Sequence, residues 1–221
     1  GMAHEINQPL AAISAYAEGA KVRMQGDNFQ VSDLGDVFDR IAADSQRASE
    51  VVRRMRQFVR KRDTDMMVVD VNRLAQEVSR FVAHDAVSKS VAMELDLVDD
   101  LPRVFADPIE IQQVMLNLVR NAMDGMDGME EKKQLAICIR PEGEFVGVAV
   151  EDSGPGIPKQ LAEQVFEPFF TSKEDGLGLG LAISRSIVEA HKGRVTVGQS
   201  SLGGARVHFS LPIYSDEEAD E

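Results

Sequence analysis

The chain lacks most of the features that mark secreted or membrane-spanning proteins. Cys138 is the single cysteine among 221 residues, so no disulfide can form within the chain. No uninterrupted apolar run approaches the roughly 20 residues that a membrane-spanning helix needs, and no signal peptide opens the sequence. We therefore expect a cytoplasmic chain, and any membrane anchor of a longer parent protein would lie outside these residues.

Positive charge is also in short supply. Lys and Arg number 24 against 37 for Asp and Glu, which gives a formal net charge of -13 at pH 7. A surface of this sign repels a phosphate backbone, so nucleic acid is not an expected partner. Hydrophobic residues still make up 43% of the chain and charged residues 28%, values that are ordinary for a globular protein. The length suits one large or two small domains.

The first third of the chain has a heptad pattern. Mostly apolar residues recur at alternating spacings of four and three, which is typical of packed helices. They are Ile6, Leu10, Ile13, Ala17, Ala20 and Met24 in a first run, and Leu34, Phe38, Ile41, Ser45, Ala48, Val52, Met55 and Val59 in a second. Turn-forming residues separate the runs. We predict a helical hairpin over residues 1–63. Because one hairpin cannot bury both seams, we expect a homodimer with a four-helix bundle.

From about residue 66 the sequence alternates between helical and strand-like segments, which predicts an α+β sandwich over residues 66–214. A helix entered through a short strand is predicted at 69–87 and a second helix at 182–190, with further strands at 91–98, 135–140, 146–151, 194–199 and 205–211. Another helix opens at Asp107, which forms a capping box with Pro108 and Glu110. The Pro- and Gly-rich segment 152–175 is typical of an active-site lid. Residues 215–221 are predicted to be an acidic tail.

His4 falls on the outer face of the predicted bundle. With Ile6 at heptad position d, His4 occupies position b, which disfavours a core role but leaves a surface histidine without function as an alternative. Pro9 cannot donate to the carbonyl of Glu5 and loosens the helix one turn from His4. A neutral imidazole is a competent nucleophile, and the neighbouring Glu5 could orient it or accept its proton.

Two motifs in the second half suit a nucleotide and its metal. Asn117 and Asn121 are four residues apart on one predicted helix, so they share a face, and their carbonyl oxygens suit Mg²⁺. Asp152 ends a predicted strand beside Gly154 and Gly156. Its carboxylate can accept from an exocyclic amine while the glycine backbone approaches a flat ring. Taken alone, the asparagines have the alternative of being surface residues, and the Asp-x-Gly-x-Gly pattern is more typical of an ordinary turn.

A third motif is rich in glycine. Gly176, Gly178 and Gly180 precede a predicted helix, whose free N–H groups and dipole suit a triphosphate. The spacing is not that of a Rossmann or P-loop motif. Lys173 lies nearby and would contact a phosphate or remain solvated. No site is assigned to His84, His191 or His208.

Five motifs follow the order found in sensor histidine kinases of two-component systems. The run His4-Glu5-Ile6-Asn7-Gln8-Pro9-Leu10 resembles their phosphoacceptor box, particularly that of the oxygen-sensing and dicarboxylate-sensing group. Residues 117–122 resemble the asparagine box, 152–156 and 176–181 the two glycine boxes, and 166–170 the phenylalanine box of the lid. The resemblance covers nearly the whole chain and implies a nucleotide-binding fold of the GHKL or Bergerat ATPase type.

The resemblance also implies a chemistry. The chain would use Mg-ATP to phosphorylate itself on His4, with Glu5 as the base, and would pass the phosphoryl group to an aspartate of a response-regulator receiver domain. Asn121 would be the principal magnesium ligand and Asn117 would support the phosphates. The remaining nucleotide-binding residues implied are Asp152, Gly154, Gly156, Lys173, Gly176, Gly178, Gly180 and Leu181.

Two other functions are compatible with parts of the sequence. An ATP-hydrolysing clamp of the gyrase, chaperone and mismatch-repair type would share the nucleotide fold, but such proteins lack the His4 hairpin and use a glutamate to activate water. A catalytically inactive scaffold that dimerises and binds a receiver would not need the intact asparagine and glycine boxes. Gln8 stands where much of the wider kinase family has Thr or Asn, which puts phosphatase activity in doubt.

Overall fold

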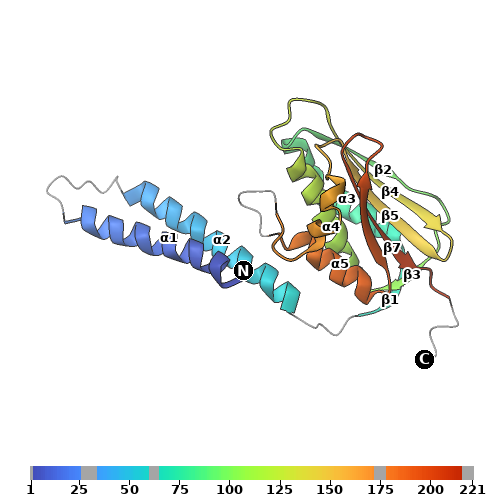
Figure 1. The fold of residues 1–221 in the computed structure, drawn as a ribbon, viewed down its shortest axis with the longest axis horizontal. Coiled ribbons are helices and arrows are strands. Elements are labelled where there is room, and N and C mark those ends of the chain that lie inside the picture. Colours follow the sequence, from blue (N-terminus) through green and yellow to red (C-terminus); the bar gives the residue numbers. More distant parts are fainter. Residues whose placement is uncertain (1, 26–33, 60–64, 172–177, 216–221) are drawn as a thin grey trace. The chain divides into compact units, whose positions relative to one another are not determined.

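The structure, a computed structural model, describes residues 2–25, 34–59, 65–171 and 178–215 (Figure 1). Within the helices, the side chains of residues 2–7, 47 and 49–59 lie outside the description. The chain divides into two compact units, residues 1–62 and 63–221, and each is considered by itself. In the described ranges, none of the helices combines the length and hydropathy of a membrane span.

The first unit consists of two helices that pack against each other. Helix α1 spans Met2–Arg23 and helix α2 spans Gly35–Val59. Pro9 lies inside α1 and is buried. The predicted helical hairpin is confirmed.

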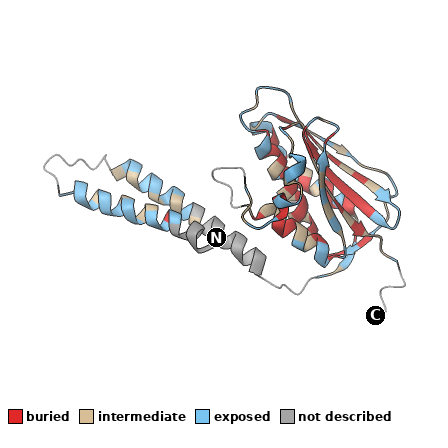
Figure 2. Ribbon diagram, viewed as in Figure 1, coloured by how far each residue is buried: buried red, intermediate tan, exposed pale blue. Residues whose placement is uncertain are grey.

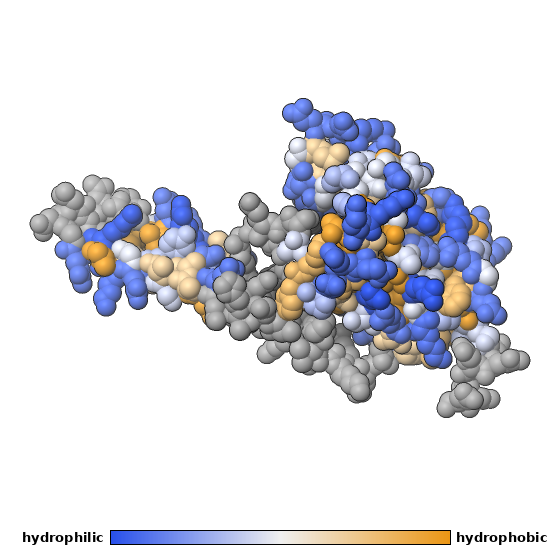
Figure 3. Space-filling view, in the orientation of Figure 1, coloured by the Kyte–Doolittle hydropathy of each residue, from blue (hydrophilic) through white to orange (hydrophobic). Residues whose placement is uncertain are grey.

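In this unit, residues at heptad position d are less exposed than residues at heptad position a. The d residues Ile13, Ala20, Leu34, Ile41 and Ala48 are partly covered, whereas the a residues Leu10, Ala17, Met24, Phe38 and Ser45 are exposed. Leu10 exposes 47% and Phe38 61% of its surface. The unit is largely exposed in Figure 2, and hydrophobic residues are visible on its surface in Figure 3. A single hairpin therefore covers only one of its two seam positions.

The second unit is a sheet with helices on one face (Figure 1). The five-stranded sheet has the order β2-β4-β5-β7-β6, with β2 and β4 parallel and the other pairs antiparallel. Its strands are β2 (Val91–Asp96), β4 (Lys133–Glu142), β5 (Phe145–Asp152), β6 (Arg194–Gln199) and β7 (Ala205–Pro212). The helices are α3 (Val71–Ser88), α4 (Pro108–Gly125) and α5 (Gly180–Ala190). Strands β1 (Met67–Val69) and β3 (Val104–Ala106) form a separate pair.

The core lies between the sheet and the three helices (Figure 2). Side chains alternate across a strand, so Leu135, Ile137 and Ile139 of β4 are buried against the helices, while Cys138 and Arg140 lie on the opposite face. Burial of Cys138 raises the pKa of its thiol. The predicted α+β sandwich is confirmed. Packing of the helices on the hydrophobic face of the sheet fixes the positions of Asp152 at the end of β5 and of the asparagines on α4.

Some element boundaries differ from the sequence prediction. Residues 69–87, predicted as a helix entered through a short strand, begin with the end of strand β1 and continue as helix α3, whose N-cap Asp70 accepts from the Arg73 backbone N–H at 3.2 Å. Helix α5 begins at Gly180, two residues earlier than predicted. Strand β3 was not predicted, because three residues carry too little alternation to be distinguished. In segment 152–175, two short 3-10 helices, η2 (Lys159–Leu161) and η3 (Gln164–Phe166), were also not predicted.

The predicted cap of α4 is only half correct. Asp107 Oδ1 accepts from the backbone N–H groups of Ile109 (2.9 Å) and Glu110 (3.2 Å), as an N-cap should. In a capping box the Glu110 carboxylate would accept from the Asp107 N–H. That N–H instead donates to Nε2 of the buried His191 at 3.0 Å. His191 Nδ1 lies 2.8 Å from the Ile187 carbonyl, so this histidine joins α5 to α4.

Candidate functional site

Asp152 is the last residue of β5 and is only 8% exposed. Its Oδ1 accepts from the backbone N–H groups of Gly154 (2.8 Å) and Ala205 (3.0 Å). Burial raises the pKa of the Asp152 carboxyl, and these two hydrogen bonds oppose the rise. Among the described residues no hydrogen bond reaches Oδ2. This oxygen is therefore the acceptor that Asp152 can offer to a bound amine.

The backbone of two glycines lies close to the side chain of Asp152. A Cβ added to Gly204 would lie 2.2 Å from Asp152 Oδ1, and one added to Gly154 would lie 2.9 Å from the same oxygen. Gly156 has a positive φ of 74°, and its added Cβ would lie 3.5 Å from the Gly204 carbonyl. Gly204 was not predicted from the sequence, since it is far along the chain from the Asp152 motif.

Asn117 and Asn121 both face the first turn of α5. Asn117 Nδ2 donates to the Gly180 carbonyl at 3.0 Å and lies 3.5 Å from Ser184 Oγ. A Cβ added to Gly180 would lie 3.6 Å from Asn121 Nδ2. The two asparagines share a helix face, as their spacing predicted, and the structure places that face beside Gly180. Both asparagines are partly exposed, so their carbonyl oxygens can reach a ligand.

The start of α5 has the character of an anion site. Leu179, which precedes the helix, supplies no side-chain cap, so the first backbone N–H groups keep their capacity for a ligand. Leu181 is partly buried and packs against the hydrophobic core, so its contribution here is mainly to packing. Lys173 and Gly176, which were predicted to contact phosphate, lie outside the described residues.

Residues 166–169 of the predicted lid contact the segment at the start of α5. The Phe169 backbone N–H donates to the Gly178 carbonyl at 2.9 Å. Gly178 has a φ of 61°, and an added Cβ would lie 2.5 Å from the Phe169 carbonyl carbon. Phe166 is buried, and the Arg185 guanidinium of α5 lies 5.5 Å from its ring centroid. No other residue type would fit at position 178 without backbone movement.

Helix α4 connects the two halves of the site. Asn117 and Asn121 lie along it beside α5. Met126, directly after its last residue, is buried beside the Asp152 turn, and its Cγ would lie 3.3 Å from a Cβ added to Gly154. The asparagine face therefore lies on α4, and the residue that follows this helix packs beside the glycine turn after Asp152.

A metal at this site would have few carboxylates to bind. No group of three or more His, Cys, Asp or Glu side chains that could hold a metal ion occurs in the described part of the chain. The asparagine oxygens are the donors that the chain itself would offer, and oxygens of a bound phosphate and of water would complete the set. That set suits Mg²⁺, which retains waters and is usually completed by substrate phosphates.

His4 and Glu5 lie on α1, one turn before Pro9. Their side chains lie outside the described part of the chain. Gln8 is exposed on the same helix.

Two family models match the chain. The His Kinase A (phospho-acceptor) domain matches residues 1–64. The histidine kinase-, DNA gyrase B-, and HSP90-like ATPase matches residues 106–215. The second match confirms the GHKL-type fold that the sequence resemblance implied.

Curated relatives with sequence similarity are sensor proteins. Sensor protein FixL of Bradyrhizobium diazoefficiens is 35% identical over 96% of this chain and 42% of its own length. The C4-dicarboxylate transport sensor protein DctS of Rhodobacter capsulatus is also 35% identical, over 96% of this chain and 32% of its own length. The chain therefore spans less than half the length of these relatives.

Solved histidine kinase structures have the same fold. The catalytic domain of histidine kinase ThkA is 32% identical with a TM-score of 0.61, covering 67% of this chain and 96% of that one. ThkA in complex with the response regulator protein TrrA matches with 28% identity and a TM-score of 0.75, covering 96% of this chain and 60% of that one. With both family models in the order of a kinase core, the chain belongs to the sensor histidine kinases of two-component systems.

Proposed function

We propose that the chain is the catalytic core of a protein histidine kinase, which autophosphorylates on His4 and transfers the phosphoryl group to an aspartate of a response regulator. Residues 1–63 would serve dimerisation and phosphotransfer, residues 66–214 would bind ATP, and residues 215–221 would form an acidic tail. The observation that carries the proposal is the arrangement of Asp152, at the end of β5 beside the residue that follows α4, and of the asparagine pair on α4, which faces the first turn of α5. An adenine amine and a triphosphate can be bound there together.

Each part of the nucleotide meets a different group. The adenine amine would donate to Asp152 Oδ2 and the ring would lie along the Gly154 and Gly156 backbone, while the phosphates would meet the N-terminus of α5. Asn121, supported by Asn117, would hold Mg²⁺, which when bound supplies neutralisation of the phosphate charge. Lys173, Gly176, Gly178, Gly180 and Leu181 complete the proposed nucleotide-binding set.

The transfer itself would be carried by α1. A ring nitrogen of His4 attacks the γ-phosphorus in line, so a P–N bond forms as the bond to the β–γ bridging oxygen breaks and ADP leaves. Glu5 accepts the imidazole proton. Positioning and charge neutralisation should supply most of the rate, as in phosphoryl transfer generally.

The partners follow from the exposed a positions and from the relatives. The five exposed a residues suit burial against a second hairpin, which supports a homodimer. ThkA is described in complex with the response regulator TrrA, which supports a receiver domain as the phosphoryl acceptor. A cytoplasmic location remains a prediction, and Gln8 leaves the phosphatase activity of the chain open to direct assay.

The proposal can be tested with γ-labelled ATP on the full-length protein. His4→Gln should abolish acid-labile labelling and leave Mg-ATP affinity nearly intact, because it removes the nucleophile alone. Glu5→Gln should slow labelling by about 10²–10⁴-fold, the usual contribution of a general base, with unchanged affinity. His84→Gln, on an exposed position of α3, is the matched control and should label normally.

The same assay separates the alternatives. Release of labelled phosphate without labelled protein would support an ATP-hydrolysing clamp. Failure of the wild-type protein to bind ATP would support an inactive scaffold. Acid-labile labelling of His4→Gln at the wild-type rate would place the acceptor elsewhere and contradict the proposal.

A further inference from the structure

Two adjacent carboxylates at the end of β5 hold the same turn from opposite faces of the sheet. Successive side chains of a strand point to opposite faces. Since Val148 and Val150 of β5 belong to the core under the helices, Asp152 lies on the helix side of the sheet and Glu151 on the opposite side. The turn is residues 200–204, between β6 and β7. The strand ladder ends at the pair Gln199 and Ala205. The turn therefore lies beyond the ladder and depends on other contacts.

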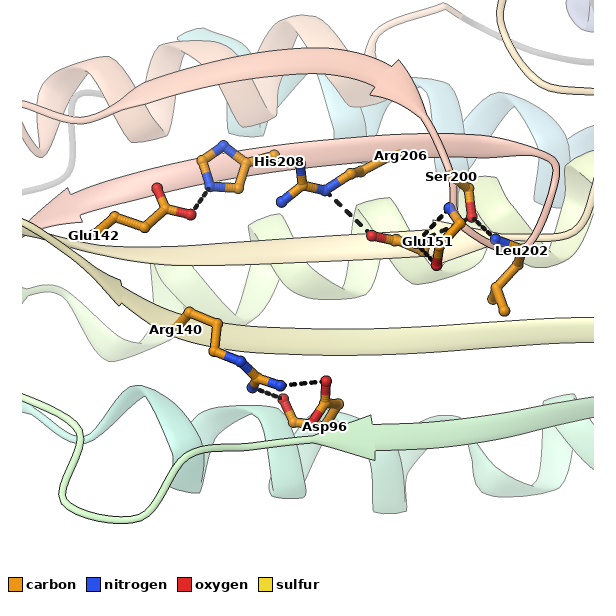
Figure 4. A network of polar contacts seen from close by, with 9 residues as sticks. Asp96, Arg140, Glu142, Glu151, Ser200, Leu202, Arg206 and His208 are labelled. Carbon is orange, nitrogen blue, oxygen red and sulfur yellow. Dashed lines mark hydrogen bonds and ion pairs between the residues drawn. The ribbon is translucent and has the colours of Figure 1, made fainter.

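Glu151 provides these contacts on the outer face (Figure 4). Its Oε2 accepts from the Ser201 backbone N–H (2.9 Å), from Ser201 Oγ (2.6 Å) and from Ser200 Oγ (3.2 Å). Its Oε1 lies 3.3 Å from Arg206 Nε. The turn is closed on itself as well, since the Leu202 N–H donates to Ser200 Oγ at 2.9 Å.

Asp152 meets the other end of the turn. The Gly204 N–H donates to the Asp152 carbonyl at 3.0 Å, and the Ala205 N–H donates to Asp152 Oδ1 at 3.0 Å. The Ser200 N–H also donates to the Gly204 carbonyl at 2.9 Å. A displacement of Ser200 and Ser201 would thus move Gly204 and Ala205, which orient the carboxylate proposed to bind adenine.

We propose that Glu151 is a positioning residue for nucleotide binding. Its hydrogen bonds hold the 200–204 turn in place, so that Gly204 and Ala205 keep Asp152 in its binding orientation. This inference rests on the proposed function, because Asp152 is the adenine contact only if the chain binds ATP. Glu151 does not touch the nucleotide; it acts through the turn.

The environment of Glu151 suits this role. Only 9% of its surface is exposed. Burial disfavours the charged form, but the hydrogen bonds from Ser201 and Ser200 and the charge of Arg206 outweigh it, so the pKa of Glu151 is lowered from 4.5. Glu142 on β4 provides a contrast: it lies 3.1 Å from His208 Nε2 on the same face of the sheet, at the opposite end of the strands from the turn.

The test compares nucleotide selectivity in the full-length protein. Glu151→Ala should weaken ATP binding about tenfold, the effect of about one lost charge-assisted hydrogen bond. It should leave unchanged the binding of a purine riboside triphosphate that lacks the 6-amino group. Ser201→Ala should change the ratio of the two dissociation constants in the same direction by a smaller factor and serves if Glu151→Ala fails to fold. Glu142→Ala should leave the ratio unchanged.

Two further measurements distinguish positioning from general stability. In the Asp152→Asn background, Glu151→Ala should cause no further loss of ATP affinity, because it acts through Asp152. Without nucleotide, it should accelerate hydrogen exchange of the Gly204 and Ala205 amides, a result that holds even if the proposed function fails. An unchanged selectivity ratio in the folded Glu151→Ala and Ser201→Ala variants, or full additivity with Asp152→Asn, would overturn the inference.

Discussion

Asp152 and Glu151 are neighbours in the chain, yet their surroundings shift the pKa values of their carboxyl groups in opposite directions. Burial raises the pKa of Asp152 despite two backbone donors. Glu151 is also buried, but its serine donors and Arg206 lower its pKa. A further hydrogen bond, such as one from an adenine amine, would stabilise the ionised form of Asp152. Glu151 already accepts such hydrogen bonds from groups within the protein.

The lowered pKa of Glu151 predicts a pH-dependent stability. Since the folded pKa lies below the unfolded value of 4.5, the ionised group stabilises the fold above about pH 4.5, and this contribution is lost as the pH falls through the folded pKa. Glu151→Gln should therefore lower the free energy of unfolding at about pH 7 by about 1–3 kcal/mol. The difference from wild type should shrink at about pH 3.5, as measured by urea denaturation. A difference that grows on acidification would contradict the assignment.

Asn121 allows a residue-scale test of the metal site. Asn121→Asp keeps an oxygen ligand but adds negative charge beside the triphosphate, so it should impair labelling of His4 and weaken Mg-ATP binding by about tenfold or more. Titration of Mg²⁺ at fixed ATP is the measurement. Arg120→Gln changes the net charge of α4 by the same amount from an exposed position. It is the matched control, and an equal effect of both changes would rule out a local role for Asn121.

Among the elements, those marked by local chemistry were predicted most accurately from the sequence. Asp107 and Pro108 specify the start of α4 by themselves, and the structure begins the helix there. The second half of that cap was wrong because His191, distant in sequence, takes the Asp107 N–H. Strand β3 was missed because its three residues show too little alternation, and its pairing with β1 is a tertiary contact that periodicity does not reveal.

The site was predictable to the extent that its motifs are contiguous. Asn117 and Asn121 share one helix face, as their spacing predicted, and the structure adds their contact with Gly180. Gly204 and Glu151 were not found, because the first joins the site only through the β5–β7 pairing and the second faces away from it. Periodicity places a side chain on a face but does not reveal which distant turn it holds.

Gly178 provides a test at the scale of an element. Gly178→Ala would place a Cβ 2.5 Å from the Phe169 carbonyl carbon at a φ of 61°. It should destabilise the fold by about 1–3 kcal/mol or displace the start of α5, and ATP binding should weaken. Thermal unfolding and a nucleotide titration would measure both effects. Gly198→Ala is the control, since an added Cβ there meets nothing within 4 Å; equal behaviour of the two variants would show that position 178 is not constrained.

At the scale of the whole molecule, the exposed a positions predict how the chain associates. Phe38 is 61% exposed in the single hairpin, and Phe38→Glu would place a charge in the seam of the proposed four-helix bundle. The variant should sediment as a monomer at micromolar concentration, where the wild type should be a dimer. Ala43→Glu adds the same charge on the outer face of α2 and should remain dimeric. A monomeric wild type that still binds nucleotide would refute the bundle.

The alternation of Glu151 and Asp152 across β5 also limits how the chain can change in length. The β4–β5 hairpin is joined by the tight turn around Gly143, whose φ is 65°. An insertion that shifted β5 by one residue against its neighbours would exchange the two faces, turning Asp152 outward and Glu151 toward the nucleotide side. Within the strand, only insertions or deletions of an even number of residues would keep each carboxylate on its present face. A change of a single residue is tolerated only within the turn, where it does not alter the register of β5.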